Sequence, residues 1–403
     1  MSDKSILRTL AKRLAELAAR PSEDDKKALW YRHNSLEETR PLVFCDPEKG
    51  WEEIIPVSSL ACEGEVARSF ERTLRKELFW AEHMRDDRAV EARFDVPILF
   101  AEDWGLQTRR IGDIAGGAYR IDPPIKNYSD IERLHFPQII IDQEQTDLRF
   151  TTACEMFGDI LAVRKAGRWW WSLGLTINLA RLRGLDQLMY DMYDHPDELH
   201  SLMALLRDGT MAMLDFLENG HLLTANHDGS YVGSGGFGWT HELPGEAFEG
   251  TIRLRDMWGF AESQETSQIS PAMFEEFVLP YQMPILERFG LNAYGCCEPL
   301  NQRWHAVEKV PRLRRVSVSP WSDITDMAEK LGGRYIFSMK PNPSYLAVPS
   351  IDEGFIRQSL RSALDASRNC RVEIIMKDCT TIGGNPQNVI RWTRIAMEEA
   401  QRL

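Results

Sequence analysis

Beyond about residue 90, the chain alternates short apolar runs with longer segments in which apolar residues recur at helical spacing. Short apolar runs bounded by polar or turn residues are typical of β-strands, and long amphipathic segments are typical of helices. Such alternation predicts repeated β–α units around a parallel sheet. The strands we expect are 96–101, 169–173, 222–226, 257–262, 292–297, 315–319, 335–340 and 372–377.

Several amphipathic segments carry recognisable helix boundaries. Pro196 interrupts the segment 186–216, so a second helix should begin there. Ser270 followed by proline predicts a capped start for a helix over 271–289. The other helices we expect cover 2–20, 22–33, 63–84, 323–331 and 388–399.

Eight strands with intervening helices indicate an α/β protein, specifically a (β/α)8 TIM barrel formed by residues 91–403. Residues 1–90 are expected to form an N-terminal helical extension packed on the barrel. A doubly wound open sheet is the alternative. It is less favoured because no Gly-x-Gly-x-x-Gly motif follows the early strands, and the run 233–238 matches it poorly.

Composition restricts the function classes. The 403 residues are 43% hydrophobic and 27% charged with a net charge of −13, which argues against a nucleic-acid surface. No apolar run approaches the roughly 18 residues of a membrane span, and residues 1–20 lack the features of a signal peptide. Seven cysteines, an odd number in a long chain, do not indicate a disulfide framework. We therefore expect a cytoplasmic protein with reduced thiols.

Reactive side chains follow three of the predicted strands. In a TIM barrel the loops after the strands build the active site, so Glu262, Cys297 and Cys379 should face one mouth. Zinc accepts thiolate and carboxylate ligands, and a catalytic zinc typically keeps three protein ligands and one open position. These three residues are therefore our catalytic and metal-ligating candidates, with Glu298 and Cys296 as alternates for the third ligand. The alternative is that the thiols only fill the core.

Other candidate substrate contacts lie near the same mouth. A glycine-rich loop after the third predicted strand carries His227, Asp228 and Tyr231, and glycine lets a backbone approach a ligand closely. The same glycines would also serve a purely structural loop. Lys340 and Asn342, after the seventh strand, are either substrate contacts or turn residues. Ser263, beside Glu262, completes this set.

Three consecutive tryptophans, 169–171, occupy a predicted strand. Core packing is the simpler interpretation, and a wall for a flat ligand is the other. Further aromatic residues near the predicted mouth favour a flat or cationic ligand. They are Tyr231, Phe237, Trp239 and Trp258.

Three segments resemble the uroporphyrinogen decarboxylase superfamily. The first, 182–200, has an Arg-Gly start followed by an Asp-x-Pro-Asp/Glu helix start. The second, 260–263, is a strand end in which Phe precedes Glu-Ser by one residue. The third, 269–281, contains a Ser-Pro-x-x-Phe-x-x-Phe-x-x-Pro-Tyr helix. The likeness covers roughly residues 150 to 400. The N-terminal Arg-Gln-Ala-Gly-Arg motif of the decarboxylase itself is absent, which argues against the haem-pathway reaction.

The cysteine pattern is similar to that of the zinc- and cobalamin-dependent methyltransferases of this superfamily. Cys297 matches the cysteine of their His-x-Cys-Gly strand end, and Cys379 matches their later cysteine. The family histidine falls on Gly295, which leaves the third ligand open. The resemblance implies Zn2+ as cofactor. The sequence contains no Asp-x-His-x-x-Gly corrinoid-binding motif, so the cobalamin should arrive on a partner protein.

These observations favour a zinc-dependent methyltransferase that moves a methyl group between a small heteroatom substrate and the corrinoid of its partner. A cofactor-independent decarboxylase or lyase that relies on Asp228 and Glu262, and a non-catalytic binding barrel, are the alternatives. The sequence identifies neither the methyl donor or acceptor nor the direction of transfer. The sequence also does not determine the oligomeric state, for which a homodimer is one of the options.

Overall fold

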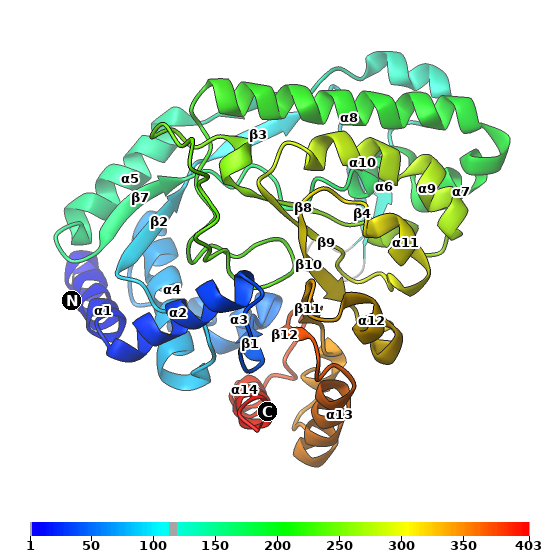
Figure 1. Ribbon diagram of the computed structural model, residues 1–403. Helices are drawn as coiled ribbons and strands as arrows, with labels where there is room; N and C mark the ends of the chain where they lie inside the picture. Colours follow the sequence, from blue (N-terminus) through cyan, green and yellow to red (C-terminus); the bar gives the residue numbers. More distant parts are fainter. Residues whose placement is uncertain (1, 113–118, 403) are drawn as a thin grey trace.

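The computed structural model describes residues 2–112 and 119–402, which form an α/β fold around a six-stranded parallel sheet (Figure 1). The strand order is β1-β12-β11-β10-β9-β8, and five of these strands lie where the sequence predicts them. The strands are β1 (Leu42–Cys45), β8 (Trp258–Ala261), β9 (Leu291–Tyr294), β10 (Leu313–Val318), β11 (Ile336–Met339) and β12 (Arg371–Met376).

Strand β1 is the member of this sheet that the sequence pattern did not reveal. It has four buried residues and pairs in parallel with β12, from Leu42 opposite Glu373 to Cys45 opposite Met376. A run this short shows no clear periodicity, and it lies within a stretch that reads as helical. Residues 1–90 therefore contribute an edge strand to the sheet as well as helices.

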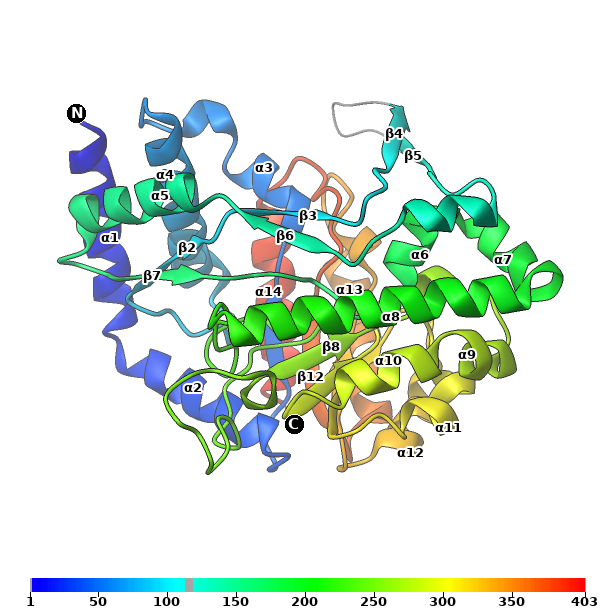
Figure 2. The ribbon, with the colours of Figure 1, turned by 90° about the horizontal axis from the view of Figure 1, so that it is seen from above.

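Helices cover the sheet in the order that the sequence indicates. Helix α10 packs on β8, α12 on β11 and α14 on β1, while the long α8 packs against α10 (Figures 1 and 2). Pro196 begins α8, as predicted, but the expected helix over 271–289 is divided at Val278, which leaves helical geometry. These helices are α7 (Leu185–Asp194), α8 (Pro196–Asn219), α9 (Pro271–Phe277), α10 (Leu279–Leu286), α11 (Trp304–Val307), α12 (Ile324–Leu331), α13 (Glu353–Ala366) and α14 (Gln387–Ala400).

A second hydrophobic cluster lies at the end of the molecule that carries the N-terminus (Figures 1 and 2). Its core includes Leu7, Leu74 and Phe157, and the parallel pair β2–β7 lies beside it. The remaining elements are α1 (Asp3–Ala18), α2 (Pro21–Asn34), α3 (Trp51–Ile54), α4 (Glu65–Phe79), β2 (Arg93–Pro97), β3 (Phe100–Asp103), β4 (Arg109–Gly112), β5 (Tyr119–Asp122), β6 (Gln138–Ile141), α5 (Gln143–Phe157), β7 (Ala162–Ala166) and α6 (Thr176–Arg183). Within the described ranges, no helix is both long enough and apolar enough to cross a bilayer.

The sheet is not closed in the described part of the chain, because two predicted strands, 169–173 and 222–226, are not strands. Side chains replace the main-chain ladder there: the Asn226 amide bonds both the N–H and the C=O of Trp258, each at 2.9 Å. Thr224 Oγ1 accepts from Gly167 N at 2.9 Å. The expected strand 96–101 is also divided, into β2 and β3, which pair with different partners.

The glycine-rich loop packs against the sheet rather than forming an open rim. Ser234 Oγ donates to the carbonyl of Gly295 at 2.7 Å, and Val232 packs with Phe260 of β8. Gly233 has a φ of +59°, and a Cβ built there would lie 2.2 Å from the Phe260 ring. The glycines therefore allow a close approach of backbone to the sheet.

A buried ion network joins the sheet to α2. Oε1 of Glu373, on β12, lies 3.1 Å from Arg315 Nε on β10. Oε2 of the same carboxylate lies 3.4 Å from His33 Nε2 on α2. Ser338 of β11 donates to the same carboxylate at 2.5 Å. Burial alone would raise the pKa of Glu373, but Arg315 and His33 outweigh it and lower the pKa to about 2. Burial lowers the pKa of His33, which keeps its imidazole neutral at pH 7.

We expect Glu373→Gln to lower the free energy of unfolding by about 3–5 kcal/mol, because it leaves the buried Arg315 guanidinium without a counter-charge. Urea denaturation followed by circular dichroism measures this. The matched control is Glu242→Gln, which breaks the ion pair of the neighbouring Arg314 with a carboxylate that is 44% exposed. Surface pairs contribute about 0–1 kcal/mol, so equal losses in the two variants would show that the buried Glu373–Arg315 pair contributes no more than a surface pair.

The same carboxylate predicts an acid limb in the stability profile. Because its pKa is lowered in the fold, its contribution is complete above the unfolded value of 4.5 and is lost as the pH falls toward about 2. The full loss amounts to about 3 kcal/mol. Unfolding midpoints measured between pH 7 and pH 3 should decline less steeply for Glu373→Gln than for the wild type. Parallel profiles would show that Glu373 does not titrate in this range.

Candidate metal and substrate site

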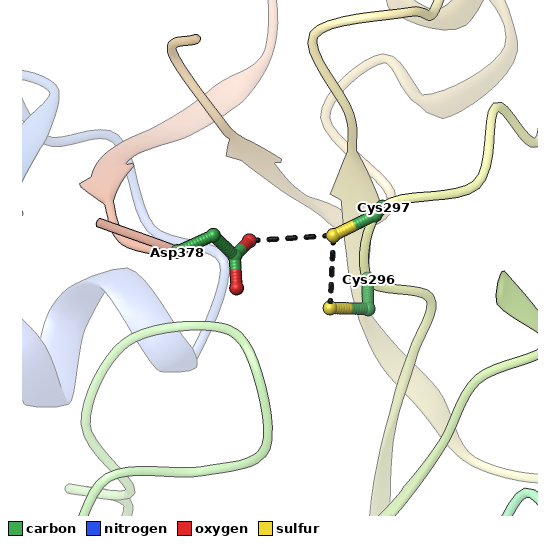
Figure 3. Close-up of side chains that lie close together, drawn as sticks. All are labelled: Cys296, Cys297 and Asp378. Carbon is green, nitrogen blue, oxygen red and sulfur yellow. Dashed lines mark hydrogen bonds between the residues drawn. The ribbon is translucent and has the colours of Figure 1, made fainter. Parts of the chain in front are cut away.

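Two thiols and a carboxylate meet where β9 and β12 end (Figure 3). Cys296 Sγ and Cys297 Sγ are 3.6 Å apart, and Cys297 Sγ lies 3.3 Å from Asp378 Oδ2. Gly295, with φ +91°, turns the chain directly after β9, and Asp378 adopts a left-handed conformation with φ +61° directly after β12 and Lys377. The ligand atoms of the three residues all lie within 4.8 Å of one another.

The lysine that precedes Asp378 sets the charge around these thiols. Lys377 Nζ lies 3.4 Å from Cys296 Sγ and 3.1 Å from Asp378 Oδ1. The contact with Cys297 and the Lys377 ammonium lower the pKa of Cys296 in spite of its burial. For Cys297 the direction is opposite: the contact with Cys296 and burial both raise the pKa of the Cys297 thiol. Cys296 is therefore the thiol that ionises more readily. Cys297 keeps its proton until a metal cation displaces it.

The donor set fits a zinc ion. Zinc binds thiolate sulfur and carboxylate oxygen, and three protein ligands leave one position for a substrate. Cys296 and Cys297 would supply sulfur and Asp378 would supply oxygen.

The structure does not gather the three ligands that the sequence predicted, Cys297, Cys379 and Glu262. In the described ranges, the one group of three or more ligand atoms within mutual reach contains Cys297 but neither of the other two. Cys379 is buried, and its sulfur donates to the Lys377 carbonyl at 3.7 Å. Cys296 was an alternate. Asp378 was missed because it follows β12 in a left-handed conformation, with φ +61°, which no local sequence pattern reveals.

Glu262 belongs to a pair of buried carboxyl groups beside the thiols. It accepts from Ser172 Oγ at 3.0 Å and from Gln264 N at 2.9 Å, while Glu298 accepts from the N–H of Ser263 at 2.8 Å and of Cys296 at 3.0 Å. Burial and the charge of Glu298 raise the pKa of Glu262, and burial raises the pKa of Glu298. A carboxyl group held neutral can donate a proton or a hydrogen bond.

Ser263, Lys340 and Asn342 have different surroundings. Ser263 is buried and its hydroxyl lies between Glu298 and Arg303, 3.3 Å from each. Lys340 is buried, its Nζ donates to Ser338 Oγ at 2.5 Å, and burial lowers its pKa to about 7. The Asn342 side chain accepts from Ser344 N at 3.0 Å and caps a short 3-10 helix, which is a turn role.

The three candidate residues of the glycine-rich loop also differ in their surroundings. Asp228 lies 2.9 Å from Arg93 and 3.1 Å from Arg164, so its carboxylate is fully engaged in ion pairs. Burial raises the pKa of Tyr231, and its hydroxyl is buried without a hydrogen-bond partner among the described residues. His227 Nε2 is likewise buried and unpartnered in the part of the chain that is described. Tyr231 precedes Val232, which packs in one hydrophobic cluster with Cys296 and Cys297.

A cavity of about 350 Å³ lies between β7, which pairs with β2, and β8, the edge strand of the six-stranded sheet. All three consecutive tryptophans line it, together with Trp258, Phe260 and Tyr231. Trp169 is buried, whereas Trp171 is 44% exposed. The triplet therefore combines the two roles considered for it, packing and pocket wall.

Comparison with known proteins supports the fold class. The chain is an α/β protein with a parallel sheet, and a solved structure of similar fold is a methyltransferase from Methanosarcina mazei. The TM-score is 0.52 at 11% sequence identity, over 94% of this chain and 98% of that chain. At this identity the likeness shows a shared fold alone. No protein-family model and no curated protein matches the sequence.

We expect the purified protein to bind one Co2+, used as a spectroscopic substitute for Zn2+, with an intense thiolate-to-cobalt absorption. Cys297→Ser and Asp378→Asn should each weaken this binding at least about tenfold, because each removes a ligand. Cys154→Ser, on α5, is the matched control and should bind normally. If Cys379→Ala or Glu262→Gln abolished binding while Asp378→Asn did not, the originally predicted ligand set would be correct.

Proposed function

We propose that the protein is a zinc-dependent methyltransferase that exchanges a methyl group between a small heteroatom substrate and a corrinoid carried by a partner protein. The observation that carries the proposal is the convergence of Cys296, Cys297 and Asp378 at the strand ends. The similar fold of a methyltransferase supports it. We regard the sheet as an opened (β/α)8 barrel whose carboxyl-end mouth holds the site.

The proposed chemistry assigns distinct roles to the residues around the thiols. Zinc, when bound, is a Lewis acid that stabilises charge on the heteroatom by several kcal/mol. The bond between the methyl carbon and the heteroatom breaks with its electron pair left on the heteroatom. The reduced corrinoid of the partner would accept the methyl group and would supply the electron pair of the new bond. The neutral carboxyl group of Glu262 provides the proton that the heteroatom takes up.

The alternative functions draw less support from the geometry. A metal-free decarboxylase built on Asp228 would need a free carboxylate, whereas Asp228 is paired with two arginines. A non-catalytic binding protein would not need a candidate metal site beside two buried carboxyl groups of raised pKa. We therefore keep methyl transfer as the working function, with localisation in the cytoplasm as expected from the sequence.

The test uses the zinc-loaded protein with free cob(I)alamin and a panel of methyl donors, including an aromatic methyl ether and a quaternary amine. Methylcobalamin formation is followed by its visible spectrum, and the reverse direction is assayed with methylcobalamin and a thiol acceptor. We expect turnover that Cys297→Ala lowers at least about tenfold. Cys154→Ala should retain full activity.

Two outcomes would overturn the proposal. Binding of cobalamin or of a donor without turnover in either direction would indicate a binding protein. Equal activity of the zinc-free protein and of Cys297→Ala would show that the reaction does not use the metal.

A further inference from the structure

We propose that the cavity between β7 and β8 binds a flat aromatic methyl ether that carries a carboxylate. The binding proposal stands on the cavity alone, and its use as methyl donor rests on the proposed function. The sequence left flat and cationic ligands open, and the charges around the cavity decide between them.

The cavity lies beside β8, which is an edge strand of the six-stranded sheet. Residues of both segments that fail to form strands line it, Trp169–Trp171 on one side and Thr224–Asn226 on the other. Its volume of about 350 Å³ lies within the usual range of small-molecule sites and suits a single substituted aromatic ring.

Fixed aromatic rings form the walls. Trp258 Nε1 donates to the Gly238 carbonyl and Trp169 Nε1 to the Leu222 carbonyl, both at 3.0 Å. Trp171 and Phe260 meet edge to face with ring centroids 5.5 Å apart. Rings held in this way are preorganised to contact a flat ligand.

One wall of the cavity adjoins the thiols. Phe260 and Val232 line the cavity and also pack in one hydrophobic cluster with Cys296. Lys377 Nζ, which contacts Cys296, lies 5.8 Å from the centroid of the Trp171 ring. A ligand in the cavity can therefore present a substituent toward the proposed metal.

The charges along the cavity disfavour a cation. Asp95, the lining carboxylate, lies 2.6 Å from Arg164 and 3.1 Å from Arg93, so it is already neutralised. Arg168 lines the cavity and has no ion-pair or hydrogen-bond partner for its side chain among the described residues. An unpaired guanidinium repels a quaternary amine and can bind a carboxylate through charge-assisted hydrogen bonds.

The experiment measures binding to the zinc-free and zinc-loaded protein by tryptophan fluorescence and calorimetry, without cobalamin. The probes are 4-methoxybenzoate, anisole, cyclohexanecarboxylate and glycine betaine. We expect 4-methoxybenzoate to bind at least about tenfold more tightly than the other three, because it alone has both a flat ring and a carboxylate.

Variants separate the two recognition elements. Trp171→Ala should weaken binding of both aromatic probes about threefold to tenfold. Arg168→Gln should weaken 4-methoxybenzoate about tenfold and leave anisole unchanged. Trp321→Ala, at a tryptophan that is 69% exposed and outside the cavity lining, and Arg20→Gln are the matched controls and should bind normally.

Equal binding of 4-methoxybenzoate by wild type and both cavity variants, or preferred binding of betaine, would overturn the inference. Failure of the proposed function has a different signature. If 4-methoxybenzoate binds as expected but no donor methylates cob(I)alamin, the pocket stands and the methyltransferase proposal falls. If other donors are turned over but 4-methoxybenzoate does not bind, only the pocket inference falls.

Discussion

Neighbouring strands in a sheet lie about 4.8 Å apart, so β9 and β12, with β10 and β11 between them, would be roughly 14 Å apart in a flat sheet. Yet Cys297, after β9, lies 3.3 Å from Asp378, after β12. Arg315 likewise reaches Glu373 across β11 at 3.1 Å. The sheet must therefore be strongly curved. This curvature places the buried ion network inside the sheet and the thiols and carboxylate at its end.

The same curvature is not carried through to closure, and the reason lies in a few side chains. Asn226 satisfies both main-chain groups of Trp258, which a neighbouring strand would otherwise pair. The main chain at 222–226 is then free to leave the sheet and enter the glycine-rich loop, which packs along β8 and β9. The gap left between β7 and β8 is the aromatic cavity. Opening of the sheet and formation of a pocket are thus one structural event.

The sequence predicted the elements whose signal is local. Five strands of the sheet and the capped or proline-started helices lie where apolar pattern and boundary residues placed them. It could not reveal that Asn226 would replace a backbone ladder, since this depends on tertiary contacts. At the site, Cys297 was among the residues predicted from the sequence, and the structure places it in the cluster with Cys296 and Asp378. Asp378 was not predicted, because its left-handed backbone redirects its side chain and so breaks the alternation along β12.

The charges at the site explain why such a cluster can be partly buried. Two thiolates and Asp378 carry three negative charges, which a divalent zinc ion would reduce to one, and the adjacent Lys377 offsets that one. Burial raises the pKa of both Glu262 and Glu298, which disfavours further negative charge beside the thiols. An approximately neutral site limits the cost of desolvation and leaves the metal's charge available to a ligand. If the proposed zinc site is correct, Lys377 would balance charge at the site rather than act as a ligand.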